Sequence, residues 1–252
     1  MGGAFAPLSI GNSNMMITSN SGKIMIFDMG QTFPYIYRDE WKLDFRDIDS
    51  VYLSHLHGDH ACIEQFAFSR YFQPKKVDGV NVKPKLFMIR DLMKEGWENV
   101  FSGGLESLPG KVMTITDYFE CKPISLNKSF IWEGHSFTPI QTVHIRSGYM
   151  IKHSYGLVVK KDPKQKEYDF YITSDTMFDR QLEEYYRQSK MVFSDCETSD
   201  FRSNVHPNYA DMVTLPTECK NKMWLYHYNQ KISTVQNDGF LGFVEKGQEF
   251  EF

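Results

Sequence analysis

Between residues 55 and 60 the chain reads His-Leu-His-Gly-Asp-His, and no other feature constrains its fold as strongly. The run places three imidazoles and a carboxylate within six residues. Burying such a group without a metal ion or a dense hydrogen-bond network would be costly. Imidazole nitrogens and carboxylate oxygens are ligands for zinc. His55, His57, Asp59 and His60 therefore predict a metal-binding loop, and the fold must bring further ligands to complete it.

Other histidines and aspartates follow predicted strands. The segments 23–27, 48–54, 136–143, 168–173 and 223–226 have the pattern of strands, and the residues that follow them are Asp28, His55, His144, Asp175 and His227. Strand ends of this kind converge at one sheet edge, where layered α/β folds usually bind ligands. A single histidine after a strand is weak evidence for a ligand, but five such positions together predict one site.

Helical patterns alternate with these strands. Residues 61–72 carry Ile63, Phe66, Ala67 and Arg70 at helical spacing. Residues 91–101 place Leu92, Met93, Trp97, Val100 and Phe101 on one predicted face. Asp179 is placed to cap a helix that ends near Ser189, and a hairpin is predicted over 14–27. The alternation predicts an α/β fold, and no linker divides the chain.

The order of the motifs resembles that of the metallo-β-lactamase superfamily. Ile26-Phe27-Asp28-Met29-Gly30 comes first, the histidine run second, and His144, Asp175 and His227 follow, so that the resemblance covers nearly the whole chain. It implies a four-layer αββα sandwich and a single domain over residues 1–252. The lactamase members replace an acidic ligand with cysteine, which this chain does not do.

The resemblance also implies a pair of metal ions. One ion would be held by His55, His57 and His144, the other by Asp59, His60 and His227, with Asp175 bridging them. Asp28 would orient the loop without binding metal. We expect two Zn²⁺ ions per subunit, although Mn²⁺ or iron could replace them.

Such a centre suits a phosphodiester, whose poor leaving group gains from a general acid. His206 is the candidate acid, because it follows a predicted strand at 191–194 and precedes a predicted short helix at 207–213. The tRNA 3′-processing endonucleases of this superfamily carry an acid after a strand and then such a histidine, and Glu197 with His206 is similar to that pair. The resemblance implies that Glu197 orients His206, while Asp59 orients the attacking water or receives its proton. Taken alone, a histidine at the position of His206 is more often a capping or surface residue than a catalytic acid.

Two further histidines, His135 and His153, fall outside these motifs, and we assign them structural or surface roles. The four cysteines lack CxxC spacing, so that neither a disulfide framework nor a zinc ribbon is predicted. No segment reaches the roughly 20 apolar residues that cross a bilayer, and the N-terminus lacks a secretory signal. We expect a cytoplasmic protein without membrane contact, in the host cytoplasm if a phage encodes it.

The substrate prediction rests on size and charge. The endonucleases carry a protruding arm, commonly between the positions of His144 and Asp175, where this chain has only a hairpin. A net charge of −4 argues against a broad nucleic-acid surface. The compact chain is therefore similar to the anti-Pycsar family of phage and bacterial enzymes, which hydrolyse 3′,5′-cyclic mononucleotides and so quench an antiphage signal.

The resemblance implies a homodimer that hydrolyses cyclic CMP and UMP, and also cyclic AMP and GMP, to linear monophosphates. Two alternatives stay open. One is a nuclease of the tRNA 3′-endonuclease type. The other is a thioester or lactone hydrolase, which would share the metals but have no use for a general acid at His206. The sequence does not distinguish a preference for pyrimidine from one for purine.

Overall fold

The structure, a computed structural model, describes residues 2–252. Its contacts divide the chain into two compact units. The first, called here the N-unit, comprises Gly11–Leu126; the second, the C-unit, comprises the segment up to Ile10 together with Asn127–Phe252. Each unit combines a sheet with helices, and the single domain over residues 1–252 stays a prediction. Within residues 2–252, no helix is long and apolar enough to cross a membrane.

The N-unit is built on a five-stranded sheet with the order β1-β2-β3-β6-β9. Its strands are β1 (Met15–Thr18), β2 (Ile24–Phe27), β3 (Ile48–Tyr52), β6 (Lys85–Ile89) and β9 (Glu120–Ile124). The predicted hairpin is confirmed, because β1 and β2 pair antiparallel. The remaining neighbours pair parallel. Asp28 directly follows β2 and His55 follows β3, so both residues lie at the carboxyl edge of this sheet.

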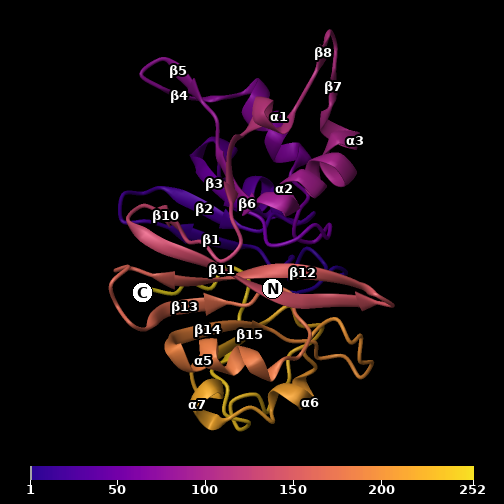
Figure 1. Cartoon of the computed structure of the whole chain (residues 1–252), viewed down its shortest axis with the longest axis vertical. Coiled ribbons are helices and arrows are strands. Elements are labelled where there is room, and N and C mark those ends of the chain that lie inside the picture. The colour runs from indigo at the N-terminus through magenta and orange to yellow at the C-terminus, as the bar shows by residue number, and fades with distance from the viewer. Residues whose placement is uncertain (1) are drawn as a thin grey trace. The chain divides into compact units, whose positions relative to one another are not determined.

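Helices and two short ribbons complete the N-unit. The helical segments are η1 (Tyr35–Glu40), η2 (Phe45–Asp47), α1 (Glu64–Phe72), α2 (Arg90–Gly96), η3 (Trp97–Phe101), α3 (Ser102–Leu105) and α4 (Ile115–Tyr118). The ribbons pair β4 (Lys75–Val77) with β5 (Val80–Val82) and β7 (Ser107–Leu108) with β8 (Lys111–Val112), and both project from the helical part of the unit (Figure 1). The predicted buried face of α1 is confirmed, since Ile63, Phe66, Ala67 and Arg70 are all buried.

The continuous helix predicted over 91–101 is wrong in one respect. After α2 the chain widens into the π-helical turn η3 before it continues as α3. A π-turn adds a residue and rotates the side chains that follow it. Leu92, Met93 and Phe101 are therefore buried as expected, whereas Val100 is 38% exposed and does not belong to the buried face.

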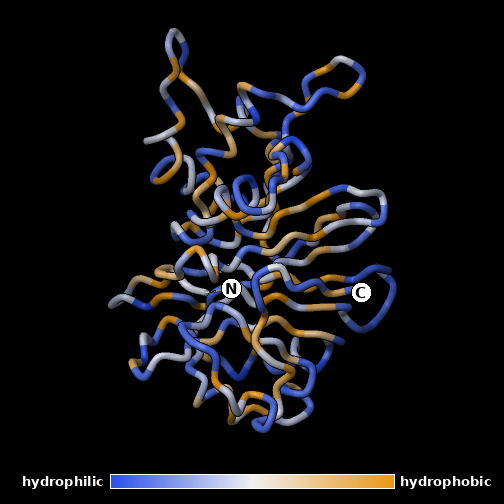
Figure 2. Tube along the Cα trace, turned by 180° about the vertical axis from the view of Figure 1, so that it is seen from behind, coloured by the Kyte–Doolittle hydropathy of each residue, from blue (hydrophilic) through white to orange (hydrophobic). Residues whose placement is uncertain are grey.

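The C-unit is built on a seven-stranded sheet with the order β10-β11-β12-β13-β14-β15-β16. Its strands are β10 (Phe130–Trp132), β11 (His135–Ser147), β12 (Met150–Lys160), β13 (Tyr168–Ile172), β14 (Ser189–Asp195), β15 (Met223–Tyr226) and β16 (Gly242–Phe243). The first four strands pair antiparallel and β13 to β16 pair parallel. The hairpin expected between His144 and Asp175 is confirmed, because β12 and β13 pair antiparallel there, and the turn between them is hydrophilic (Figure 2).

The helices of the C-unit gather on one side of its sheet (Figure 1). They are η4 (Arg180–Leu182), α5 (Glu183–Gln188), α6 (Tyr209–Met212) and α7 (Thr217–Lys220). Asp179 caps η4 as predicted, because its side chain accepts a hydrogen bond from the Gln181 N–H. One buried cluster joins Tyr186 and Met212 of the helices to Val192 and Leu225 of the strands. This core fixes the strand ends that carry Asp175, Asp195 and His227.

The prediction that His144 follows the end of a strand is wrong. β11 continues through His144 to Ser147, and its register with β12 shifts between Val143 and Ile145. Val143 faces His153 and Ile145 faces Lys152, so His144 is the additional residue of a β-bulge. Bulges re-aim a side chain within a continuous strand. The sheet therefore presents His144 from the middle of a long hairpin.

Gly30 locks the histidine run against the sheet. The Met29 N–H donates to the His60 carbonyl at 2.6 Å, and a Cβ on Gly30 would lie 2.0 Å from the Asp59 carbonyl oxygen.

We predict that Gly30→Ala lowers the free energy of unfolding of the metal-free protein by about 2 kcal/mol or more, measured by chemical denaturation. Gly58→Ala is the matched control in the same loop, because a Cβ there meets nothing within 4 Å. Equal stabilities of the two variants would contradict the prediction.

Candidate metal centre

In the N-unit, one buried carboxylate organises the histidine run. Asp28 Oδ1 accepts the Ser54 N–H at 2.7 Å, and Oδ2 accepts the Ser54 hydroxyl at 2.6 Å. Oδ2 also lies 2.7 Å from His60 Nδ1. Burial raises the pKa of Asp28, while the hydrogen bonds from His60 and Ser54 oppose that shift. Three donors on one carboxylate favour its ionised form, which only accepts hydrogen bonds.

This network assigns the protons on two histidines. The Ser54 hydroxyl donates its single proton to Asp28. Its oxygen, 3.0 Å from His55 Nδ1, therefore accepts the hydrogen bond from that ring nitrogen. His60 Nδ1 donates to Asp28 in the same way. Both rings therefore carry their lone pair on Nε2. Histidines that bind metals usually donate their other ring N–H to a carboxylate, a carbonyl or water, and this arrangement matches that pattern.

The other two residues of the run lie beside this pair. The His57 ring packs edge-on against His55, with 4.8 Å between the centroids, and its side chain is exposed. Asp59 is buried, and its Oδ2 lies 3.4 Å from His60 Nε2. Asp28, His55 and His60 form one group whose ligand atoms are close enough to share an ion. We expected Asp28 to orient the loop, and its contacts are those of an orienting residue.

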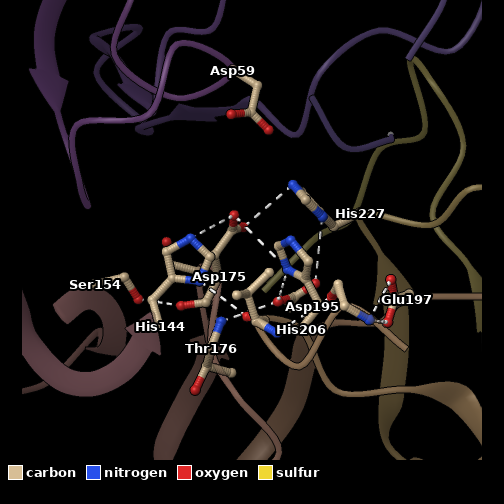
Figure 3. Close-up of polar contacts among 12 residues, drawn as sticks. Asp59, His144, Ser154, Asp175, Thr176, Asp195, Glu197, His206 and His227 are labelled. Carbon is tan, nitrogen blue, oxygen red and sulfur yellow. Dashed lines mark hydrogen bonds and ion pairs between the residues drawn. The ribbon is translucent and has the colours of Figure 1, made fainter. Parts of the chain in front are cut away.

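In the C-unit, Asp175 lies between two histidines (Figure 3). His144 Nδ1 donates to the Val205 carbonyl at 3.0 Å, so the lone pair of this ring is on Nε2. That atom lies 3.6 Å from Asp175 Oδ2, and His227 Nε2 lies 3.4 Å from Asp175 Oδ1. Both separations exceed an N–H···O hydrogen bond. For His144, the Nε2 lone pair faces a carboxylate at this distance, which is what a shared cation requires. His144, Asp175 and His227 therefore have the residue chemistry for a divalent metal.

The backbone around these candidate ligands is locally strained. Ser174 has φ 56° and His227 has φ 63°, and Asp28 of the N-unit has φ 60°. Residues other than glycine rarely adopt this region, and the cost is accepted mainly at functional positions. The Asp175 carbonyl is held in place by the hydroxyls of Ser154 and Thr142. These hydroxyl contacts hold the backbone of the candidate ligand Asp175 just beyond the end of β13.

His206 has a partner that the sequence analysis missed. Its Nδ1 lies 2.8 Å from Asp195 Oδ2, and Asp195, the last residue of β14, is completely buried (Figure 3). The expected direct contact of Glu197 with His206 is not formed, because the Glu197 carboxylate accepts hydrogen bonds from the Ser203 N–H instead. The sequence does carry a signal for Asp195, because it follows the predicted strand at 191–194, just as the other candidate residues follow predicted strands.

Asp195 links His206 to the candidate ligands of the C-unit. Its Oδ1 lies 3.5 Å from His227 Nδ1, and its Oδ2 accepts the Thr176 N–H at 3.0 Å. Asp175, Asp195, His206 and His227 form a second group whose ligand atoms are close together. The two histidines outside the motifs bind backbone carbonyls instead: His135 binds that of Glu133 and His153 that of Thr142.

Comparison with known proteins decides the family. A family model described as "Anti-Pycsar protein Apyc1" matches residues 1–250. The chain belongs to the Apyc1 family of anti-Pycsar proteins. An Apyc1 protein of Paenibacillus harenae is 29% identical over 255 residues, which cover 99% of this chain and 96% of the relative. The Apyc1 protein of Bacillus phage BSP38 is 26% identical over 248 residues, which cover 95% and 91% respectively.

Solved structures show the fold of this Apyc1 family member. The metallo-β-lactamase fold protein YhfI from Bacillus subtilis aligns with a TM-score of 0.74 and 14% identity, covering 99% of this chain and 96% of its own. The short form of human tRNase Z aligns with a TM-score of 0.65 and 15% identity, covering 98% and 95%. The predicted metallo-β-lactamase fold is therefore confirmed.

The role of Asp28 in this family member can be tested through metal affinity. In Asp28→Asn, the side-chain amide N–H faces groups that are themselves donors, Ser54 and His60. The protons on the His55 and His60 rings are then no longer held on Nδ1. We predict that Zn²⁺ affinity, measured by competition with a chelating dye, falls about 10–100-fold. Asp49→Asn is the control, because Asp49 is an N-unit acid that binds Lys23 and Lys75 outside the run. Wild-type affinity of Asp28→Asn would exclude the orienting role.

Proposed function

We propose that this Apyc1 family member is a metal-dependent phosphodiesterase that hydrolyses 3′,5′-cyclic mononucleotides to linear monophosphates and so counters the Pycsar defence. The proposed substrates are cyclic CMP and UMP, and also cyclic AMP and GMP. One observation carries the proposal: His206, held by the buried Asp195, stands beside Asp175 and His227. A carboxylate–histidine pair next to metal ligands is what protonation of a leaving alkoxide needs. The name shared by the relatives supports the biological role.

We propose that two cations are bound by the seven residues named from the sequence. One ion is assigned to His55, His57 and His144, the other to Asp59, His60 and His227, and Asp175 is assigned to both. The geometry within each unit supports this proposal, because His55, His60 and His144 all carry their lone pair on Nε2. Zinc fits imidazole and carboxylate ligands, and manganese or iron could replace it.

Such cations, when bound, lower the pKa of water and neutralise the charge that gathers on phosphoryl oxygens. The remaining tasks belong to the side chains. Asp59 is assigned to orient the attacking water or receive its proton. Asp195 keeps a proton on His206 Nδ1 and fixes the ring, so the proton for the leaving ester oxygen comes from Nε2. The His206 side chain is 17% exposed while Asp195 is buried, so a substrate can reach the ring.

The proposed partners follow from size and charge. A cyclic mononucleotide carries one phosphodiester and needs few contacts beyond the metals. The net charge of −4 disfavours a broad nucleic-acid surface. We also propose, from the family resemblance, that the protein acts as a homodimer in the bacterial cytoplasm; sedimentation equilibrium of the purified protein tests the oligomeric state.

The activity is tested by incubating the metal-loaded protein with the four cyclic nucleotides, a precursor tRNA and a thioester. We expect cyclic nucleotides to become linear monophosphates and metal removal by a chelator to abolish the reaction. His206→Ala should lower kcat about 10²–10⁴-fold, because the leaving oxygen loses its proton donor. Asp195→Asn should lower it less, since the ring remains but is misoriented.

His135→Ala is the matched control, because His135 binds only the nearby Glu133 carbonyl and should react like wild type. Cleavage of tRNA alone would replace the proposal with a nuclease. Turnover of the thioester alone, unaffected by His206→Ala, would indicate the third reaction class.

A further inference from the structure

Glu197 begins the loop that leads from β14 to His206, and its carboxylate holds that loop. The side chain is 7% exposed, and its two oxygens lie 3.3 and 3.0 Å from the Ser203 amide nitrogen. At the base of the loop, the Glu197 N–H donates to the Pro207 carbonyl and the Tyr209 N–H donates to the Glu197 carbonyl, both at 2.9 Å. The loop is therefore closed at its base by two backbone hydrogen bonds. In its middle, Glu197 holds the backbone at Ser203 and Asp211 binds the neighbouring Arg202 side chain at 2.7 Å.

The anchored part of the loop serves two functional residues. The Ser203 hydroxyl accepts the Val205 N–H at 3.3 Å, and the Val205 carbonyl accepts the proton of His144 Nδ1 at 3.0 Å. His206, the proposed acid, is the next residue. Glu197 thus holds Ser203, and Ser203 in turn holds Val205, whose carbonyl fixes the tautomer of His144. The same stretch of backbone carries His206.

Glu197 does not act on His206 by direct contact. His206 Nδ1 binds Asp195, and Figure 3 shows Glu197 to one side of that pair, bound to a backbone nitrogen. Its partner is a neutral amide, so the chemistry at Ser203 requires an acceptor of the right shape and not a negative charge. An uncharged glutamine has a side-chain oxygen that can accept the same hydrogen bond.

We propose that Glu197 is a positioning residue that acts through Ser203 and Val205 to hold both His144 and His206. It couples the orientation of one metal ligand to the placement of the proton donor. The effect on catalysis rests on the proposed function, whereas the effect on the metal does not. Glu197 therefore has two measurable consequences, one of which needs no substrate.

The test compares Glu197→Ala and Glu197→Gln in the full chain. Glu197→Ala should weaken Zn²⁺ binding about 10-fold or more, as the loss of a group that orients a ligand does, and should lower kcat more than it raises KM. Glu197→Gln should restore most of both and keep the wild-type pH profile. Zn²⁺ affinity is measured by chelator competition, and kcat and KM on cyclic CMP.

Asp169→Ala is the matched control for loss of a buried loop-holding carboxylate. Asp169 is buried in β13 and accepts the Lys161 N–H at 2.7 Å, so its removal loosens the β12–β13 turn. This variant should lose stability but keep wild-type Zn²⁺ affinity. If Glu197→Ala binds Zn²⁺ like wild type, or Glu197→Gln is as impaired as Glu197→Ala, the positioning role is overturned. If the wild type hydrolyses no cyclic nucleotide, the proposed function fails, while the Zn²⁺ affinities still decide the role of Glu197.

Discussion

The histidine run depends on the carboxylate of Asp28. Burial raises the pKa of this acid, and the Ser54 backbone, the Ser54 hydroxyl and His60 all direct hydrogen bonds to it that oppose the shift. These contacts fix the ring protons of His55 and His60 before any metal arrives. The parallel pairing of β2 with β3 places Asp28 and Ser54 side by side, so the proton pattern of the loop is set by the topology of the sheet.

Much of this arrangement could be predicted from the sequence. The strands before Asp28, His55, Asp175 and His227 were found because apolar runs ended at polar residues with ligand chemistry. The α1 face was found because its apolar residues recur at helical spacing. The strand predicted before His144 ends too early. Backbone hydrogen bonds to β12 extend β11 to Ser147, although its apolar pattern stops at Val143. The π-turn in η3 left no mark in the residue pattern.

The choice between Asp195 and Glu197 shows where sequence reasoning stops. The two acids are two residues apart at the end of one strand, and the order of motifs does not distinguish them. The path of the backbone decides: Asp195 still belongs to β14 and faces His206, whereas Glu197 begins a loop that folds back on its own side chain. Only the three-dimensional course of the loop separates an orienting acid from a loop anchor.

The bulge at His144 also bears on how this fold can diversify. Eight consecutive pairs, from Ser136 with Lys160 to Val143 with His153, fix the register of the hairpin before the bulge. Three further pairs follow the bulge, from Ile145 with Lys152 to Ser147 with Met150, and the tip that they lead to is exposed at Tyr149, Met150 and Ile151. The tip can therefore change in length or sequence while the eight pairs before the bulge keep the candidate ligand His144 in place. A hairpin of this design separates the stretch that positions a candidate metal ligand from an exposed tip that can change independently.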